Sequence, residues 1–147
     1  MVFAGIFATM IPALALLEAQ GKGIGITQPW QYFWTTGWLS TFLDNAPTYL
    51  AFTSIAQAQV GAATVGGLTA TGLVPGAGLA PAALLTAISC GAVMMGALTY
   101  LGNAPNFTVR SIAEDTGLRM PSFFGFMKYS LAVLLPVFAV VTAIFFR

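Results

Sequence analysis

Two short stretches of the chain hold the side chains whose types and spacing could do chemistry. In FLDNAPTYLAF (residues 42–52) and YLGNAPNFTVR (residues 100–110), the pattern Leu-x-Asn-Ala-Pro is followed by one further residue and then by Tyr or Phe. Asparagine offers a neutral oxygen ligand, and proline lacks the backbone N–H that a helix interior needs. Asp44 adds a carboxylate to the first copy. The pattern predicts two interrupted helices whose polar groups could bind an ion or a small substrate.

The composition indicates that these stretches lie in lipid. Hydrophobic residues make up 58% of the chain and charged residues only 6%, against roughly 25% charged residues in an ordinary soluble domain. Residues 45–109 carry no charge at all, and the chain has no histidine. A net charge of +1 excludes the basic surface that nucleic-acid binding requires. We therefore expect an all-α integral membrane protein with the lipid bilayer, and no nucleic acid, as its surroundings.

Three apolar segments are candidates for membrane crossing. About 20 residues are needed to cross ~30 Å of hydrocarbon at ~1.5 Å per residue. We expect a transmembrane helix at residues 1–18, a broken helix at 81–117 and a last transmembrane helix at 121–147, within a single membrane domain that covers residues 1–147. The Gly-rich segment 61–80 is predicted to be a loop.

Residues 28–60 predict a re-entrant helical hairpin. The two arms on either side of Asp44-Asn45-Ala46-Pro47 are each too short for a comfortable crossing, so entry and return on one membrane face fit better. The tip must then face protein or a water-filled cavity, because an unpaired peptide group costs several kcal/mol in lipid. The aromatic side chains of the first arm are expected to form an interfacial belt and packing surface: Trp30, Tyr32, Phe33, Trp34 and Trp38.

The second motif copy predicts a discontinuous transmembrane helix. The apolar run from Ala82 is expected to continue to Leu101, with the helix resuming through Asn106. Such a break presents carbonyl oxygens from one half and N–H groups from the other. The candidate ion- or substrate-binding residues are Asp44, Asn45, Thr48, Gly102, Asn103, Asn106 and Thr108, with Pro47 and Pro105 as helix-breaking residues and Asp44, Asn45 and Asn103 as sodium ligands. A lone Asn-Ala-Pro could instead end a helix at the water interface, but two copies in matching contexts favour a functional role.

The motifs also resemble a known family. MIPALALL, FLDNAPTYLAF, GAVMMGALTYLGNAPNFTVRSIAEDTGLRMPSFFGFM and a closing apolar helix are similar to the C-terminal part of the ion transporter superfamily, in the citrate-transporter-like branch often described as sodium:proton antiporters. The similarity runs from about Met10 to Phe146. It implies an inverted-repeat fold in which each half supplies a hairpin and a broken helix, and an elevator-type homodimer in the bacterial inner membrane. Since this chain holds one hairpin and one broken helix, we expect it to be one inverted-repeat half of a secondary transporter, with the missing N-terminal half as a partner.

Three functions stay open at this point. Asp44 would repel a carboxylate unless a cation lay between them, which favours sodium/proton antiport with sodium as the coupling ion and no other cofactor. The alternative is a sodium- or proton-coupled citrate or dicarboxylate symporter, in which Asn45, Thr48 and Asn106 would hold the small carboxylate. A third is a non-transporting membrane scaffold subunit. An enzyme is not expected, because no nucleophile is accompanied by a base. Arg110 and Glu114, one helical turn apart, predict a surface ion pair.

Overall fold

The structure, a computed structural model, describes residues 2–69 and 80–146. Within these residues the chain is helical and contains no strand. The α-helices are α1 (Val2–Gln20), α2 (Pro29–Ser40), α3 (Asn45–Val60), α4 (Pro81–Met95), α5 (Ala104–Asp115) and α6 (Phe123–Phe145). Three short 3-10 helices accompany them: η1 (Gly21–Gly23), η2 (Val65–Thr69) and η3 (Gly96–Leu98). The all-helical prediction is therefore confirmed for the described part of the chain.

The helix ends follow from local side-chain chemistry. In α2, Pro29 occupies the first turn and the Gln31 side chain accepts from the Gln28 N–H at 3.0 Å, which satisfies an N–H that would otherwise lack a partner. In α6, the Ser122 hydroxyl accepts from the Gly125 N–H at 3.2 Å. Helix α3 ends at Gly61, whose φ of 71° is left-handed and favours glycine.

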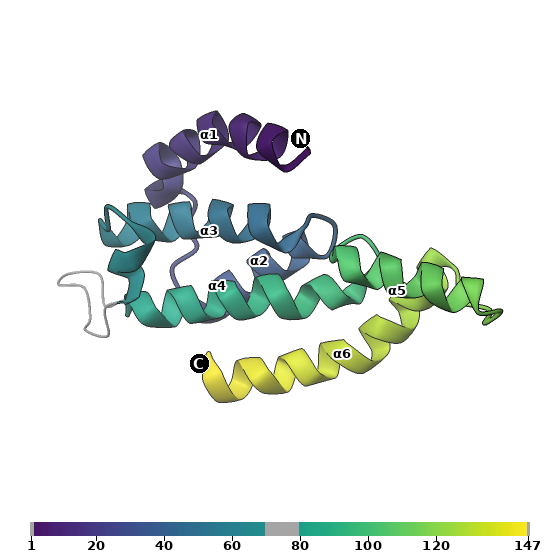
Figure 1. Cartoon of the computed structure of the whole chain (residues 1–147). Helices are drawn as coiled ribbons and strands as arrows, with labels where there is room; N and C mark the ends of the chain where they lie inside the picture. The colour runs from purple at the N-terminus through teal and green to yellow at the C-terminus, as the bar shows by residue number, and fades with distance from the viewer. Residues whose placement is uncertain (1, 70–79, 147) are drawn as a thin grey trace.

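Helices α2, α3 and α4 form the packed centre, and α1 lies against α3 (Figure 1). Helix α2 packs along α4 so closely that a Cβ at Gly91 would overlap the Phe33 carbonyl. Helix α6 returns beneath α4 (Figure 1), and its Phe138 ring meets the buried ring of Phe33 edge-on, with centroids 6.2 Å apart. The core residues are Tyr32, Phe33, Phe52, Ile55, Leu84, Ile88, Met95, Leu98 and Phe138.

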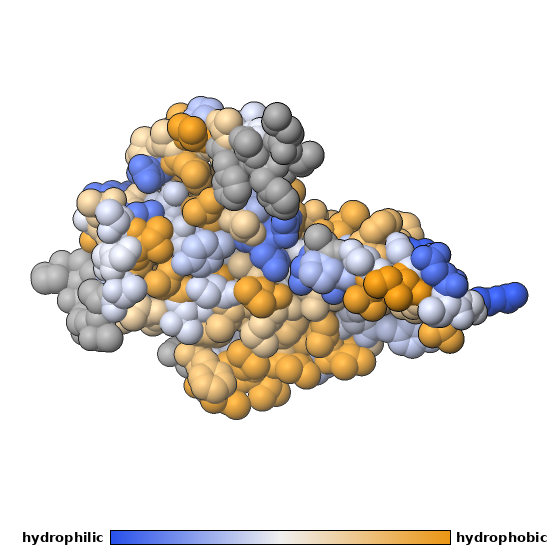
Figure 2. Space-filling view, viewed as in Figure 1, coloured by the Kyte–Doolittle hydropathy of each residue, from blue (hydrophilic) through white to orange (hydrophobic). Residues whose placement is uncertain are grey.

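Among the described residues, two helical segments are long and apolar enough to cross a membrane: Pro81–Leu98 and Phe123–Phe145. Only 6% of the second segment is buried inside the structure, and apolar side chains line the edge of the molecule along α6 (Figure 2). A long apolar helix that exposes its side chains is typical of contact with lipid. The expected span at residues 1–18 coincides with α1, some of whose side chains lie outside the described residues, and its crossing stays a prediction.

Two connections hold the motif copies. Residues 41–44, here called the hairpin turn, join α2 to α3, and residues 96–103, here called the helix break, join α4 to α5. Because α3 begins where α4 ends, the two connections lie at the same end of the helix pair (Figure 1). The re-entrant path of the hairpin and its place in an inverted repeat stay predictions.

Several boundaries differ from the expected ones. The α-helix of α4 ends at Met95 rather than Leu101, because Gly96 opens a 3-10 turn. Helix α5 begins at Ala104, before Pro105. Helix α6 (Phe123–Phe145) begins and ends two residues inside the expected span of 121–147. The segment predicted as the loop 61–80 contains η2, and its residues 70–79 lie outside the described residues.

Candidate functional site

The hairpin turn and the helix break are joined by hydrogen bonds between buried side chains and backbone. The hydroxyl of Thr99 donates to the Thr41 carbonyl. The hydroxyl of Ser40, at the end of α2, donates to the Ala92 carbonyl of α4. Ser40, Thr41 and Thr99 are at most 1% exposed. A buried polar group that loses its hydrogen-bond partner costs free energy. The bond from Thr99 to Thr41 therefore holds the two connections together, and the bond from Ser40 to Ala92 holds α2 against α4 beside them. We call this contact region the junction.

Asn45, the asparagine of the first motif, contacts the helix break directly. With its amide oriented so that the nitrogen faces acceptors, the nitrogen lies 2.8 Å from the Ala92 carbonyl oxygen and 3.1 Å from that of Gly102. It also lies 2.9 Å from the Ser40 hydroxyl oxygen. The expected ligand Asn45 therefore uses its donors to hold α4 and the break.

The side chains of Asn106 and Thr41 also form hydrogen bonds with carbonyl groups in and beside the helix break. The Asn106 amide donates to the Thr99 carbonyl at 3.1 Å and to the Gly96 carbonyl at 3.4 Å. The Thr41 hydroxyl approaches the Met95 carbonyl at 3.4 Å. Three carbonyl groups in and beside the break, those of Met95, Gly96 and Thr99, therefore already accept side-chain hydrogen bonds. A carbonyl oxygen has two lone pairs, so each of these groups can still take a second partner.

Two glycines allow this close approach. A Cβ at Gly102 would lie 2.5 Å from the Ser40 carbonyl oxygen and 2.8 Å from that of Thr41. A Cβ at Gly96 would lie 2.6 Å from the side-chain amide of Asn45. Real Cβ atoms do not make contacts this short, so glycine at both positions is what lets the backbones of the two connections meet.

Asp44 lies at the edge of the junction with its side chain exposed. Its carboxylate accepts from the Asn45 N–H at 2.8 Å and so caps α3. Within the described residues Asp44 forms no ion pair. Its neighbours Phe42 and Leu43 are exposed as well, at 55% and 47%. The Asp44 carboxylate is therefore accessible at the surface of the described structure.

The structure brings only some of the remaining predicted site residues to the junction. Thr48 is buried, and its hydroxyl donates to the Asp44 carbonyl at 3.1 Å. Asn103 is half-buried at the start of α5, with no side-chain bond that caps the helix. Thr108 is exposed, further along α5.

The two prolines lie in the first turns of α3 and α5. Pro47 is the third residue of α3 and Pro105 the second residue of α5. Proline is tolerated in the first turn of a helix, where the missing N–H has no intrahelical partner in any case. Each proline therefore begins a helix, and the interruptions precede them.

Sequence reasoning missed the hydroxyl residues that make the junction. The repeated pattern is longer than Leu-x-Asn-Ala-Pro, since Thr41-Phe42-Leu43 and Thr99-Tyr100-Leu101 precede the two Asn-Ala-Pro runs at the same spacing. Extending the comparison by two positions finds both threonines. Their hydroxyls lie at equivalent places in the repeat, and the one on Thr99 bonds the backbone of Thr41.

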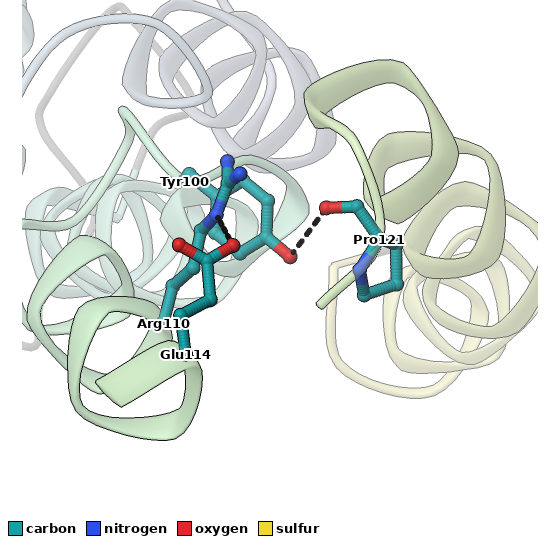
Figure 3. Close-up of polar contacts among 4 residues, drawn as sticks. All are labelled: Tyr100, Arg110, Glu114 and Pro121. Carbon is teal, nitrogen blue, oxygen red and sulfur yellow. Dashed lines mark hydrogen bonds and ion pairs between the residues drawn. The ribbon is translucent and has the colours of Figure 1, made fainter. Parts of the chain in front are cut away.

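A separate cluster ties the helix break to the start of α6 (Figure 3). The buried Tyr100 side chain donates from its hydroxyl to the Pro121 carbonyl at 3.4 Å, and the Arg110 guanidinium lies 4.8 Å from its ring centroid. Arg110 Nε lies 3.0 Å from Glu114 Oε1. The predicted ion pair is confirmed. Arg110 is the cationic residue nearest to the second motif in the sequence, and its side chain already contacts the Tyr100 ring and the Glu114 carboxylate.

The donor set at the junction is neutral oxygen plus one carboxylate. Across the described residues, no group of three or more His, Cys, Asp or Glu side chains is placed to hold a metal ion. Oxygen donors of this kind suit hard cations.

Comparison with known proteins gives one match. The family model described as "Putative citrate transport" matches residues 1–146. No curated protein and no solved structure matches the chain.

Proposed function

The chain belongs to the citrate transport family, and from that premise we propose that it is the ion-binding half of a secondary active transporter that exchanges sodium for protons. The family is one of transporters, which agrees with the expectation that the chain is not an enzyme. The exchange reaction, the sodium site and the elevator-type movement are our proposals.

The observation that carries this proposal is the position of Asp44. It is an exposed carboxylate without an ion-pair partner in the described structure, next to a junction built from neutral hydrogen bonds. No lysine or arginine lies between it and Arg110 in the sequence, and Arg110 is already paired. An uncompensated acid in a membrane segment is costly in free energy, so such residues usually mark an ion or substrate pathway.

Exchange follows from competition for this carboxylate. Sodium binds the ionised Asp44, with Asn103 and carbonyl oxygens of the break as neutral ligands. A proton that binds Asp44 removes the charge and releases sodium, so the two ions use the site in turn. In this proposal a second, N-terminal half would supply another hairpin and broken helix opposite the junction, and the assembled protein would be a homodimer in the bacterial inner membrane.

The family description favours a second candidate, a sodium- or proton-coupled symporter of citrate or a related dicarboxylate. Asn45, Thr48 and Asn106 would then hold the substrate carboxylates while Asp44 held the coupling cation. In the structure the amides of Asn45 and Asn106 already donate to backbone carbonyls, and substrate binding would have to replace those hydrogen bonds. We therefore propose the symporter as the second candidate.

The test uses the full-length protein in proteoliposomes with a trapped pH-sensitive dye. We expect sodium added outside to drive proton movement, and we expect Asp44→Asn to abolish it. Asp115→Asn is the matched control, because Asp115 is also exposed but lies at the far end of α5. No sodium-driven pH change, together with uptake of labelled citrate, would replace exchange by symport. If the folded protein shows neither sodium-driven proton movement nor citrate uptake, the scaffold function remains.

A further inference from the structure

We infer that Thr99 is a positioning residue, which holds the hairpin turn with Asp44 and the helix break with Asn103 in one fixed arrangement and thereby sets the sodium affinity of the site. The effect on sodium rests on the proposed function. The arrangement itself does not, and it is tested separately below.

The Thr99 hydroxyl takes part in three hydrogen bonds. Thr99 is 0% exposed, and its hydroxyl donates to the Thr41 carbonyl in the hairpin turn. The same oxygen accepts from the Leu101 N–H at 3.1 Å and from the Gly102 N–H at 3.0 Å. Thr99 therefore satisfies donors of the break and an acceptor of the turn at once. Within the described junction, no other side-chain oxygen both donates to one connection and accepts from backbone N–H groups of the other.

The backbone groups that bond to Thr99 have few other hydrogen-bond partners within reach. Leu101 and Gly102 lie outside any helix, so their N–H groups have no helical carbonyl to meet. Gly102 is buried, with the carbonyls of Ser40 and Thr41 close above its Cα. Removing the Thr99 hydroxyl leaves these groups unpaired in a place with no room for a larger replacement. The turn and the break would then move apart or change conformation.

The chain contains a matched control for this argument. Thr36 in α2 is also 0% exposed, but within the described structure its hydroxyl has no hydrogen-bond partner. Valine has nearly the shape of threonine and lacks the hydroxyl. Thr36→Val and Thr99→Val therefore make the same chemical change at equal burial and differ in the hydrogen bonds that are lost.

The first readout is the distance between the two connections, which does not depend on transport. Spin labels are placed at Phe42 and Leu101, which are 55% and 60% exposed, in a Cys90→Ala background because Cys90 is the one native cysteine. We expect a narrow distance distribution in the parent and in the Thr36→Val and Thr99→Ser variants. In Thr99→Val we expect it to broaden or shift. An unchanged distribution in Thr99→Val would overturn the inference.

The second readout is the sodium dependence of sodium-driven proton movement in proteoliposomes. For Thr99→Val we expect the half-saturating sodium concentration to rise by roughly tenfold, as loss of a buried hydrogen-bonded group predicts. Thr99→Ser should restore the parental value and Thr36→Val should keep it. A broadened distance distribution with unchanged sodium dependence would show a purely structural threonine and overturn the positioning role. If the parent protein moves no protons, the proposed function fails, while the spin labels still decide whether Thr99 fixes the junction.

If Thr99→Val does not fold, hydrogen exchange on the unaltered protein still tests the inference. Hydrogen exchange of the peptide that covers residues 99–103 should be slow, because the N–H groups of Leu101 and Gly102 donate to a buried oxygen. Exchange of these amides as fast as in the exposed connection at residues 63–64 would contradict the inference.

Discussion

The side-chain nitrogen of Asn45 lies 3.1 Å from the backbone carbonyl oxygen of Gly102. The asparagine of the first motif thus contacts the residue that precedes the asparagine of the second. The two copies of the motif are not two independent helix ends, because each supplies groups that satisfy the other. This relationship makes the junction sensitive to small changes on either side.

Replacing Asn45 tests whether its role is to hold the helix break. We expect Asn45→Ala to lower the free energy of unfolding by about 1–3 kcal/mol, because buried acceptors lose their donor. Asn103→Ala, at the same motif position, should change it by less than about 0.5 kcal/mol, since Asn103 makes no capping bond. Thermal unfolding in detergent measures both, and equal losses would refute the different roles.

Gly102→Ala tests the close approach of the two backbones. The added Cβ would lie 2.5 Å from the Ser40 carbonyl oxygen and 2.7 Å from that of Gly96. Since backbone cannot rotate away as a side chain can, we expect a loss of about 1–3 kcal/mol, as for other overpacked sites. Gly5→Ala is the control, because nothing lies within 4 Å of its added Cβ and alanine favours the helix. A Gly102→Ala variant as stable as the control would show that the junction opens freely.

The Arg110 cluster should contribute modestly and in two separable parts. Glu114→Gln removes an ion pair whose Arg110 and Glu114 side chains are 26% and 44% exposed, so we expect a loss of about 0.3–0.5 kcal/mol that disappears at high salt. Arg110→Gln also removes the contact with the Tyr100 ring, and we expect a further loss of about 0.5–1 kcal/mol that salt reduces less. Unfolding at low and high salt measures both. Identical effects of the two variants would show that the ring contact contributes nothing.

A charge on the outer face of α6 tests its contact with lipid. Val133 is 65% exposed near the middle of the helix. We expect Val133→Asp to disfavour membrane insertion by about 3 kcal/mol, the cost of aspartate at a helix centre. Val133→Leu should insert normally. A glycosylation-mapping insertion assay compares the variants, and full insertion of Val133→Asp would place this face against protein or water.

Much of the architecture can be predicted from local pattern. The apolar runs, the polar interruptions and the glycine-rich connections give the helices and the family, because each depends on residues close together in the chain. One helix end differs clearly from its expected place, because the α-helix of α4 gives way to a 3-10 turn at Gly96.

The roles of the polar residues could not be predicted in the same way. The sequence shows that Asn45 and Asn106 are polar residues in apolar surroundings, which equally suits a ligand or a brace. Whether such a residue is a ligand or a brace depends on partners that are distant in the sequence, such as Ala92 and Gly102 for Asn45. The two threonines were hidden because threonine is common in membrane helices and becomes informative only when the motif copies are aligned over a longer stretch.

The bond between Thr99 and Thr41 joins residues 58 positions apart. It therefore closes a long loop of chain, and the entropy of closing a loop grows only with the logarithm of its length. Each doubling of the loop costs only about 0.6 kcal/mol. The connection between α3 and α4 can consequently lengthen with little penalty to the junction. Related chains are expected to carry their insertions in that connection, and to keep the length of the stretches at 40–45 and 96–106.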